Sequence, residues 1–586
     1  MKKFINLLLG ITAGFMISCQ QNTLSNNVGE TDQIKINQIG YYPGTKKFAA
    51  IPAESAQGAF HLTKADGNTI VYEGTLSEPF SADYSDKKTR IADFSAFTEK
   101  GVYRLVVPSL GKSFPFTIGE SVFENLAKGS IKAFYFNRAS TSLEEKHADQ
   151  WARPEGHPDD QVMIHASAAS AQRPEGTIVS APLGWYDAGD YNKYIVNSGI
   201  TMGTLLSVYE DFPDYFKQQN LNIPESDNQI PDLLDEILWN LKWMLKMQDP
   251  NDGGVYHKLT TAEFEGMVMP HEATNQRYMV AKSTTATLDF AAVMAQANRV
   301  FKEFNPDLAI ECLKAAEMAW GWAKKYPDIL YRQDEMNKEH SPQIQTGAYG
   351  DKSAEDEWIW AASELYISTH NLSYLEDISV PSDQFKLPTW SNVSWLGYYS
   401  LLRHRTELNN LPGPLVEQIK SLLITQADKY LEAKKKSRFQ TVMGYSAENF
   451  NWGSNSNAAN QGILLIQAYL LNENREYLEA ALSNLDYILG RNATGYSFVT
   501  GYGSKTPLYP HHRPSEAEPD KAPVPGFIVG GPNPGQQDKC DYPSSIPDES
   551  YIDETCSYAS NEIAINWNAP FAYLTNALEA LYARKN

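Results

Sequence analysis

The hydrophobic pattern of this chain changes near residue 119, and that change constrains its architecture more than any other feature. Before residue 119, short apolar runs such as Phe60–Leu62 and Gly101–Val107 alternate with turn residues. Short strands at this spacing indicate a β-sandwich of immunoglobulin type over residues 32–118. This segment contains no cysteine, so we expect a generic sandwich without the Cys…Trp…Cys core of antibody domains.

From residue 119 to residue 586, apolar residues recur with helical periodicity. Pro231 suits the first position of a helix, and the leucines and isoleucine that follow it share one face. Comparable patterns predict eleven helices, at about 122–137, 195–211, 231–247, 284–302, 308–325, 354–370, 392–405, 415–434, 456–471, 475–489 and 561–583. No strand pattern of similar strength occurs in this part of the chain.

Helical hairpins closed into a ring, an (α/α) barrel, are the architecture that this series of helices favours. The long connections 249–282 and 492–552 would gather at one end, and connections of that length usually carry function. A two-layer bundle or a solenoid is the alternative, although the sequence has no fixed repeat of the kind that a solenoid needs. The expected fold is mostly α, with a small β-sandwich in front.

The N-terminus is typical of an export signal. A basic start precedes an apolar run over residues 4–17, which is too short to span a bilayer as a mature helix. Residues 16–19, Met-Ile-Ser-Cys, resemble a bacterial lipobox, which would make Cys19 the lipidated first residue after a signal peptide (1–19) and before a polar tether (20–31). We expect an exported lipoprotein on a bacterial envelope membrane; an ordinary secretory signal with a chance cysteine is the alternative.

Export also favours a disulfide between Cys540 and Cys556, which lie 16 residues apart in a loop-rich stretch. The chain carries 50 basic and 71 acidic residues, a formal net charge of −21. Such a charge would repel a nucleic-acid backbone, so we expect no nucleic-acid partner. The 12 Trp, 33 Tyr and 24 Phe instead indicate surfaces that stack flat, uncharged ligands such as sugars. We expect a monomer.

Two carboxylates lie three residues apart in the sequence Asp187-Ala188-Gly189-Asp190, hereafter the Asp-Ala-Gly-Asp motif. The small residues between them allow a ligand to approach the backbone closely. Two neighbouring carboxylates can separate their pKa values or hold one water molecule between them. The alternative is a turn in which Asp190 caps the helix predicted at 195–211.

Two further clusters carry chemistry. His511, His512 and Arg513 stand between two prolines, which hold donors at fixed angles that suit hydroxyl recognition. Glu562 lies at the start of an apolar helical run. The alternatives are histidines that merely tie down a loop, and an acid that the helix dipole favours.

Together, the three motifs resemble glycoside hydrolase family 9, whose members are largely cellulolytic, inverting enzymes. Residues 497–513 are similar to the family's histidine signature and residues 551–569 to its acidic signature. The Asp-Ala-Gly-Asp motif is its third hallmark. The resemblance covers residues 119–586, and the sandwich resembles the N-terminal immunoglobulin-like domain of one branch of the family. It implies an (α/α)6 barrel, in agreement with the helix count.

The resemblance implies an inverting endo-β-1,4-glucanase with Glu562 as general acid and Asp190 as general base. Asp187 would hold the attacking water with Asp190. The acid must stay protonated near neutral pH, so its surroundings must raise its pKa. Trp567 and Tyr558 are candidates for those surroundings, and Tyr558 is also expected to bind substrate.

The resemblance also assigns residues that bind sugar. His511 and Arg513 would bind hydroxyls beside the scissile bond, and Asp553 would orient one of them or support the site. His257 is a further candidate, with a loop histidine as the alternative. Aromatic rings on the loops would stack on sugar rings, with core packing as the alternative for each; the candidates are Trp185, Tyr186, Tyr256, Trp390 and Tyr502.

No cofactor is required for this reaction, but one acidic stretch resembles a calcium site of relatives. Asp351, Ser353, Asp356 and Glu357 would supply oxygens there. Calcium takes six to eight oxygen ligands, so backbone groups and a distant side chain would also be needed. The alternative is an acidic helix N-terminus.

The expected partner is a β-glucan polysaccharide: cellulose, mixed-linkage glucan or xyloglucan. One alternative is a lipid-anchored glycan-binding protein without activity, although Asp187, Asp190 and Glu562 argue against it because binding needs no acid–base pair. Another is a different (α/α) barrel hydrolase or lyase. Those that act on anionic sugars would need a basic cleft, which fits poorly with the net charge.

Overall fold

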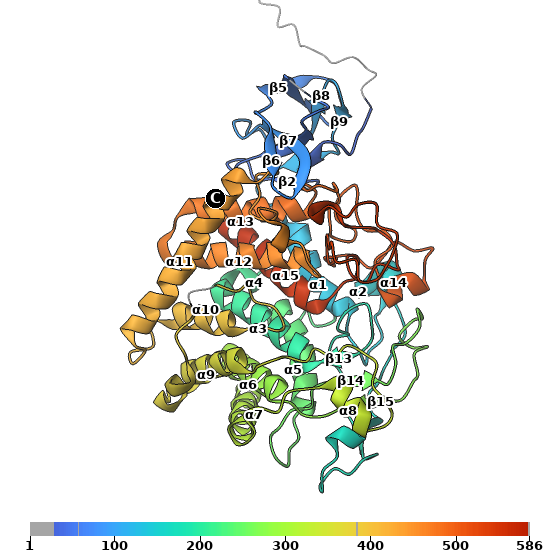
Figure 1. The fold of residues 1–586 in the computed structure, drawn as a ribbon, viewed down its shortest axis with the longest axis vertical. Coiled ribbons are helices and arrows are strands. Elements are labelled where there is room, and N and C mark those ends of the chain that lie inside the picture. Colours follow the sequence, from blue (N-terminus) through green and yellow to red (C-terminus); the bar gives the residue numbers. More distant parts are fainter. Residues whose placement is uncertain (1–28, 57, 383–384, 584–586) are drawn as a thin grey trace, which may run out of the picture.

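The computed structural model describes residues 29–56, 58–382 and 385–583 (Figure 1). The expected signal peptide, Cys19 and most of the expected tether therefore lie outside the described residues. Among the helices of the described ranges, none is long and apolar enough to cross a membrane.

Residues 30–118 form two packed sheets. One has the order β1 (Lys35–Ile36), β3 (Phe48–Pro52), β7 (Ser85–Asp93) and β6 (Phe80–Ala82). The other has the order β2 (Gly40–Tyr41), β10 (Phe116–Ile118), β8 (Gly101–Val107), β4 (Ala59–Lys64) and β5 (Ile70–Thr75), with β9 (Gly111–Lys112) on β8. Phe60, Leu105 and Phe116 are buried in one apolar core within this domain. The sandwich prediction is confirmed. Strand β7 was not predicted, because most of its residues are polar or charged.

Each of the eleven predicted helices forms, and the barrel prediction is confirmed. Within the described chain, six helices buried on most sides make the inner layer: α3 (Ile195–Asp211), α6 (Thr284–Phe301), α9 (Glu355–Thr369), α10 (Ser394–His404), α12 (Ser454–Asn472) and α15 (Ile565–Ala583). The outer helices are α1 (Glu124–Phe136), α5 (Asp232–Lys246), α7 (Pro306–Lys325), α11 (Gly413–Lys436) and α13 (Arg475–Ile488). A 3-10 helix, Leu372–Asp377, stands between α9 and α10 where a sixth outer helix would be.

Short elements fill the connections. They include the helices α2 (Glu145–Ala148), α4 (Pro213–Phe216), α8 (Gln333–Glu339) and α14 (Arg513–Ala517). A five-stranded sheet that the sequence did not predict has the order β12 (Ile178–Val179), β11 (Val162–Ile164), β15 (Arg277–Met279), β14 (Lys258–Thr261) and β13 (Lys193–Tyr194). These strands have two to four residues, too few to show an alternating pattern.

The sandwich sits on the C-terminal part of the barrel, near α11 and α13 (Figure 1). The Asn37 amide donates to Asp486 Oδ1 at 2.7 Å, and the Tyr42 hydroxyl donates to Glu579 Oε2 at 2.5 Å. Gln38 Oε1 accepts the backbone N–H groups of Ser504 and Lys505, each at 2.8 Å. The sandwich therefore holds the long loop that leads to His511.

Candidate active site

A cleft of about 890 Å³ opens between the loops that precede α3, α10, α12 and α15. It contains Asp190 and Glu562, which lie far apart in the sequence. The other residues on its wall are mainly aromatic, amide or small: Ala188, Tyr194, Phe264, Gly347, Ala348, Tyr349, Pro388, Thr389, Trp390, Asn451, Trp452, Ser456, Asn457, Asn460, His511, Arg513, Tyr558, Ala564, Asn566 and Trp567.

Backbone contacts bring the acidic motifs together. The N–H of Ile565 donates to the carbonyl of Asp187 at 2.8 Å, and the N–H of Gly189 donates to Glu562 Oε1 at 3.3 Å. A Cβ on Gly189 would lie 2.2 Å from the carbonyl oxygen of His511. Only glycine allows this approach, which explains the small residue between the two aspartates.

The two aspartates have different partners. Asp190 Oδ2 accepts from the Asn192 amide at 2.5 Å and from the Tyr194 hydroxyl at 3.2 Å. Both carboxylate oxygens of Asp187 accept from the Asn197 amide nitrogen, at 2.8 and 3.0 Å, and Oδ2 also accepts from the Tyr349 hydroxyl at 2.9 Å. The residue that precedes α3 is Tyr194, so the alternative that Asp190 caps this helix is wrong.

The environment of Glu562 suits a general acid. Burial raises its pKa well above the ordinary value, and the charges of Asp190 and Asp187 add to that effect, while Arg513 opposes it. Burial and then the charge of Asp190 also raise the pKa of Asp187. A protonated Glu562 beside a pair of carboxyl groups is the arrangement that acid–base hydrolysis needs.

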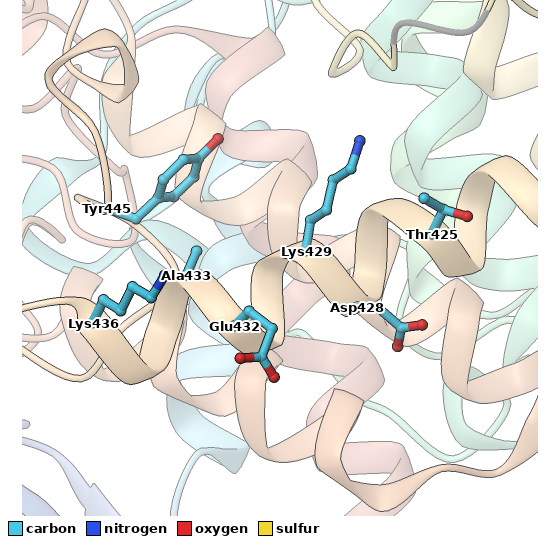
Figure 2. Close-up of a pocket in the computed structure, with 7 residues that line it drawn as sticks. All are labelled: Thr425, Asp428, Lys429, Glu432, Ala433, Lys436 and Tyr445. Atoms are coloured by element: carbon cyan, nitrogen blue, oxygen red, sulfur yellow. The ribbon is translucent and has the colours of Figure 1, made fainter.

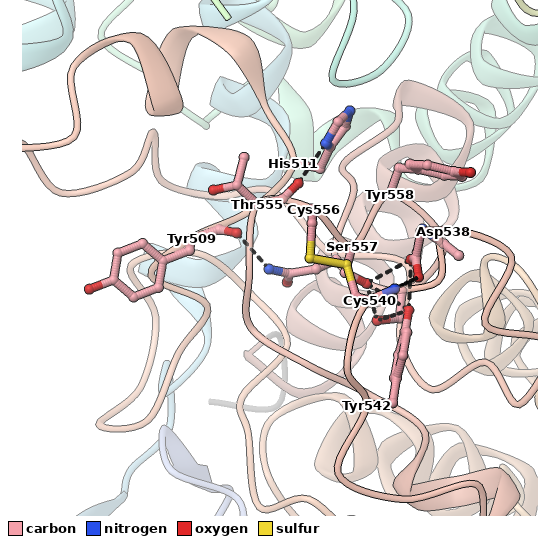
Figure 3. The surroundings of a disulfide bond; sticks show 12 residues. Tyr509, His511, Asp538, Cys540, Tyr542, Thr555, Cys556, Ser557 and Tyr558 are labelled. Carbon is pink, nitrogen blue, oxygen red and sulfur yellow. Dashed lines mark hydrogen bonds between the residues drawn. A yellow bond between two sulfur atoms is a disulfide. The ribbon is translucent and has the colours of Figure 1, made fainter.

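His511 is held in one tautomer. Its Nδ1 lies 2.7 Å from the Thr555 carbonyl oxygen, which can only accept, so Nδ1 carries the proton. Burial lowers the pKa of His511, so the ring is neutral and its Nε2 is an acceptor for a hydroxyl group. Figure 3 shows that Thr555 adjoins the disulfide between Cys540 and Cys556, which joins two parts of the same loop region.

Arg513 lies on the cleft wall, and Asp553 supports the loop behind it. Arg513 donates from Nη1 to the Gly189 carbonyl at 2.8 Å. The Asp553 carboxylate accepts the N–H groups of Leu508 and Tyr509, at 2.8 and 3.0 Å. It also accepts the Asn561 amide at 3.0 Å and does not line the cleft. Asp553 was counted among the expected catalytic residues as a group that orients His511 or Arg513 or supports the site, and its hydrogen bonds to the His511 loop fit the supporting role.

Four residues expected to bind sugar are buried away from the cleft, so these predictions are wrong. The Trp185 indole donates to Glu236 at 2.8 Å. Tyr186 is 1% exposed and its hydroxyl lies 2.8 Å from a ring nitrogen of His157. Both side chains use their polar atoms inside the protein, as buried aromatic residues usually do.

The other two are Tyr256 and His257. The Tyr256 hydroxyl donates to Asp249 Oδ2 at 3.1 Å, and His257 stacks on Tyr331 with ring centroids 4.1 Å apart. Both are fully buried. Tyr502 is a fifth such case, because it packs on the main core instead of lining the cleft.

Of the expected aromatic residues, Trp390, Tyr558 and Trp567 do line the cleft. The sequence missed Phe264 and Trp452, which are 48% and 44% exposed there. Trp452 and Tyr558 lie close, with ring centroids 5.6 Å apart. Phe264 belongs to the connection 249–282, whose length was the only signal that could have indicated it.

The expected calcium ligands meet a carboxylate from another helix. Both oxygens of Glu357, on α9, are buried without a hydrogen-bond partner among the described residues, and so are both oxygens of Asp289, on α6. Burial raises the pKa of both groups; the charges of Asp356 and Asp351 add to this effect at Asp289, and the charges of Asp289, Asp356 and Asp351 add to it at Glu357. Ser353 accepts the N–H of Glu355 at 3.1 Å.

Oxygen donors without partners suit a hard cation. Within the described residues, however, no three His, Cys, Asp or Glu side chains are already arranged to hold a metal ion. Asp289, which lies 62 positions before Asp351 in the chain, could not be assigned to this cluster from sequence.

A second hollow lies on the outer helix α11 (Figure 2). Its wall consists of Thr425, Asp428, Lys429, Glu432, Ala433, Lys436 and Tyr445. Asp428 and Glu432 are exposed to solvent. This hollow therefore lacks the buried carboxyl groups that distinguish the main cleft.

Comparisons with known proteins agree with the geometry of the cleft. The sequence profile described as Glycosyl hydrolase family 9 matches residues 123–575, and the one described as cellulase N-terminal ig-like domain matches residues 29–112. A xyloglucan-specific endo-β-1,4-glucanase of Bacteroides ovatus is 48% identical over 98% of both chains. Endoglucanase D of Acetivibrio thermocellus is 34% identical over 94% of this chain and 84% of its own.

Solved structures show the same similarity. A structure titled Bacteroides ovatus GH9 superposes with a TM-score of 0.89 at 46% identity, covering 94% of this chain and 100% of the other. A metagenome-derived family 9 endoglucanase superposes with a TM-score of 0.86 at 32% identity, covering 94% and 99%.

Proposed function

This chain belongs to glycosyl hydrolase family 9 and is an endo-β-1,4-glucanase, and on that premise we propose that it cuts the backbone of xyloglucan with inversion of anomeric configuration. The observation that carries the mechanism is that Glu562 and Asp190 share one cleft, with surroundings that keep Glu562 protonated.

Glu562 gives its proton to the glycosidic oxygen as the bond from that oxygen to the anomeric carbon breaks. A water molecule attacks the anomeric carbon from the opposite face and gives its proton to Asp190. All the hydrogen bonds that described residues make to Asp190 end on Oδ2, which leaves Oδ1 for that water. Asp187 holds the same water, and Asn197 and Tyr349 fix the orientation of the Asp187 carboxylate.

The cleft supplies the groups that bind a neutral polysaccharide. Neutral His511 accepts a hydroxyl hydrogen through Nε2, and Arg513 donates from the same wall. Trp390, Trp452 and Phe264 offer rings for stacking on sugars. Xyloglucan is proposed among the β-1,4-glucans because the Bacteroides ovatus relative, matched along 98% of its length, is specific for it.

The test uses the protein without residues 1–19 and its Glu562→Gln form. Each is incubated with xyloglucan, carboxymethyl cellulose and mixed-linkage glucan, and new reducing ends are measured. We expect the parent to be fastest on xyloglucan and the Glu562→Gln form to be nearly inactive on all three. A folded parent that is faster on carboxymethyl cellulose would overturn the xyloglucan assignment, and no hydrolysis of any polymer would overturn the activity.

We also propose that the protein is an exported monomer tethered to an envelope membrane by lipid on Cys19. The basic start, the apolar run of residues 4–17 and the lipobox-like residues 16–19 support this proposal. Labelled palmitate should appear in the parent and not in Cys19→Ser. Release of Cys19→Ser from the membrane fraction would support the tether, and equal membrane retention of both forms would refute it.

We propose, finally, that the cluster of Asp289, Asp351, Asp356 and Glu357 binds a calcium ion, with Ser353 and backbone oxygens completing the ligands. The unpartnered oxygens of Asp289 and Glu357 support this proposal. Bound calcium would neutralise the cluster and fix the start of α9 to α6. It takes no part in the proton transfers described above.

A further inference from the structure

Lys258 is a buried lysine beside the catalytic base, and the mechanism above does not use it. It opens strand β14 and pairs with Tyr194 of β13, the strand that directly follows the Asp-Ala-Gly-Asp motif. Its ammonium group donates to Gln333 Oε1 at 2.8 Å, to the Gly347 carbonyl at 2.7 Å and to Thr346 Oγ1 at 3.0 Å. All three acceptors are neutral, although a buried cation is costly unless a negative charge compensates it.

A chain of hydrogen bonds connects this cation to the catalytic base. From Lys258 it passes to Thr346, whose hydroxyl lies 2.7 Å from the hydroxyl of Thr260. The Thr260 hydroxyl donates to Asn192 Oδ1 at 3.0 Å. The Asn192 amide donates in turn to Asp190 Oδ2 at 2.5 Å. Every link can be oriented with its donor on the lysine side, so each bond polarises the next toward the carboxylate.

A second contact also links the Lys258 ammonium group to Asp190, through Tyr194. The Lys258 ammonium lies 5.5 Å from the ring centroid of Tyr194, and the Tyr194 hydroxyl donates to Asp190 Oδ2. The backbone N–H of Thr261 donates to Asn192 Oδ1 at 3.0 Å, which fixes the orientation of the Asn192 amide. Asn192 must therefore present its N–H group to Asp190.

We propose that Lys258 is a positioning residue for the catalytic base: through Thr346, Thr260 and Asn192 it fixes Oδ2 of the Asp190 carboxylate, so that Oδ1 meets the water. The proposal rests on the proposed function, in which Asp190 is the base. It is carried by the unbroken series of hydrogen bonds and by the finding that, among the described residues, no carboxylate is a direct partner of Lys258.

The charges around Asp190 make such a cation necessary. Two carboxyl groups, Asp187 and Glu562, face Asp190, and burial followed by the charge of Asp190 raises the pKa of both. The other titratable groups that face it are Tyr194, Tyr349, His511 and Lys258.

Lys258 itself faces Tyr194, Tyr331 and His257 in addition to Asp190. Burial lowers the pKa of Lys258 to about 7, and the charge of Asp190 acts against that effect. The lysine is therefore charged on the acid side of neutrality, where the base must remain ionised.

The experiment measures kcat and KM on xyloglucan against pH for the parent and for Lys258→Met. Without the cation, the negative charge in the cleft loses a nearby positive charge, so the acidic limb of the kcat/KM profile should move up by about one pH unit. At pH values on the acidic limb, kcat/KM of Lys258→Met should be about tenfold lower than that of the parent. KM should change less than about twofold, because Lys258 does not line the cleft.

Lys47→Met is the matched control. Lys47, in the sandwich, is also fully buried, and within the described part of the chain its ammonium group donates only to neutral groups, the carbonyl oxygens of Pro43, Thr45 and Ser95. Its replacement should lower the melting temperature and leave the pH profile in place. Thr346→Val interrupts the series without removing a charge, and it serves if Lys258→Met does not fold.

A shift of the acidic limb in Lys258→Met or Thr346→Val, and not in Lys47→Met, supports the proposal. An unshifted limb in folded Lys258→Met, or in folded Thr346→Val where Lys258→Met does not fold, overturns it. These outcomes differ from failure of the proposed function, which would appear as an inactive parent.

Discussion

Opening the disulfide should weaken sugar binding more than proton transfer. The bond joins Cys540 to Cys556 across 16 positions, and Thr555 and Tyr558 lie beside it (Figure 3). The Thr555 carbonyl fixes the tautomer of His511, while Tyr558 lines the cleft. Glu562, in contrast, is fixed by the backbone of Gly189.

The size of the effect of removing the disulfide follows from the length of the loop that it closes. A cross-link over a loop of this size removes about 3 kcal/mol of conformational entropy from the opened state. Without it, the population of open loops should therefore rise roughly 100-fold. The variant is Cys540→Ala with Cys556→Ala, and Cys312→Ala is the control because Cys312 is a buried free thiol on α7.

Two measurements check this prediction. Hydrogen exchange should quicken at the amide of Asn561, which donates to the Ser557 carbonyl, and KM for xyloglucan should rise at least threefold. The change in kcat should be smaller, since Glu562 keeps its place. Exchange and KM equal to those of Cys312→Ala would refute the reasoning, because the loop would then be fixed without the disulfide.

Three further predictions concern the domain contact, the acid and the calcium cluster. Deleting residues 32–118 should lower the melting temperature more than it changes KM, because the sandwich braces the barrel; an equally stable barrel would contradict this. Because burial raises the pKa of Glu562 in the folded protein, the acid keeps its proton above the usual carboxyl range, and the alkaline limb of the kcat/KM profile should begin well above that range; an alkaline limb that begins near pH 4.5 would contradict it. Chelation should lower the melting temperature of the parent, calcium should restore it, and Asp289→Asn should respond to neither; an identical response of the variant would exclude Asp289 as a ligand.

The sequence by itself determined the elements and the main chemistry. Helical periodicity is a property of neighbouring residues, so all eleven helices could be predicted within a few positions of their bounds. The Asp-Ala-Gly-Asp motif and Glu562 could be assigned because they stand in recognisable local patterns. The small strands β11–β15 could not be predicted, since segments of two to four residues have no periodicity to detect.

Only the tertiary structure decided which side chains meet. Trp185 and Trp452 both stand in loops before an inner helix, yet one is fully buried against Glu236 and the other is 44% exposed in the cleft. Asp289 joins the acidic cluster, and Lys258 reaches Asp190, through partners that are distant in the chain. Burial and charge at each position depend on segments that fold against it from elsewhere, and no local pattern in the sequence records them.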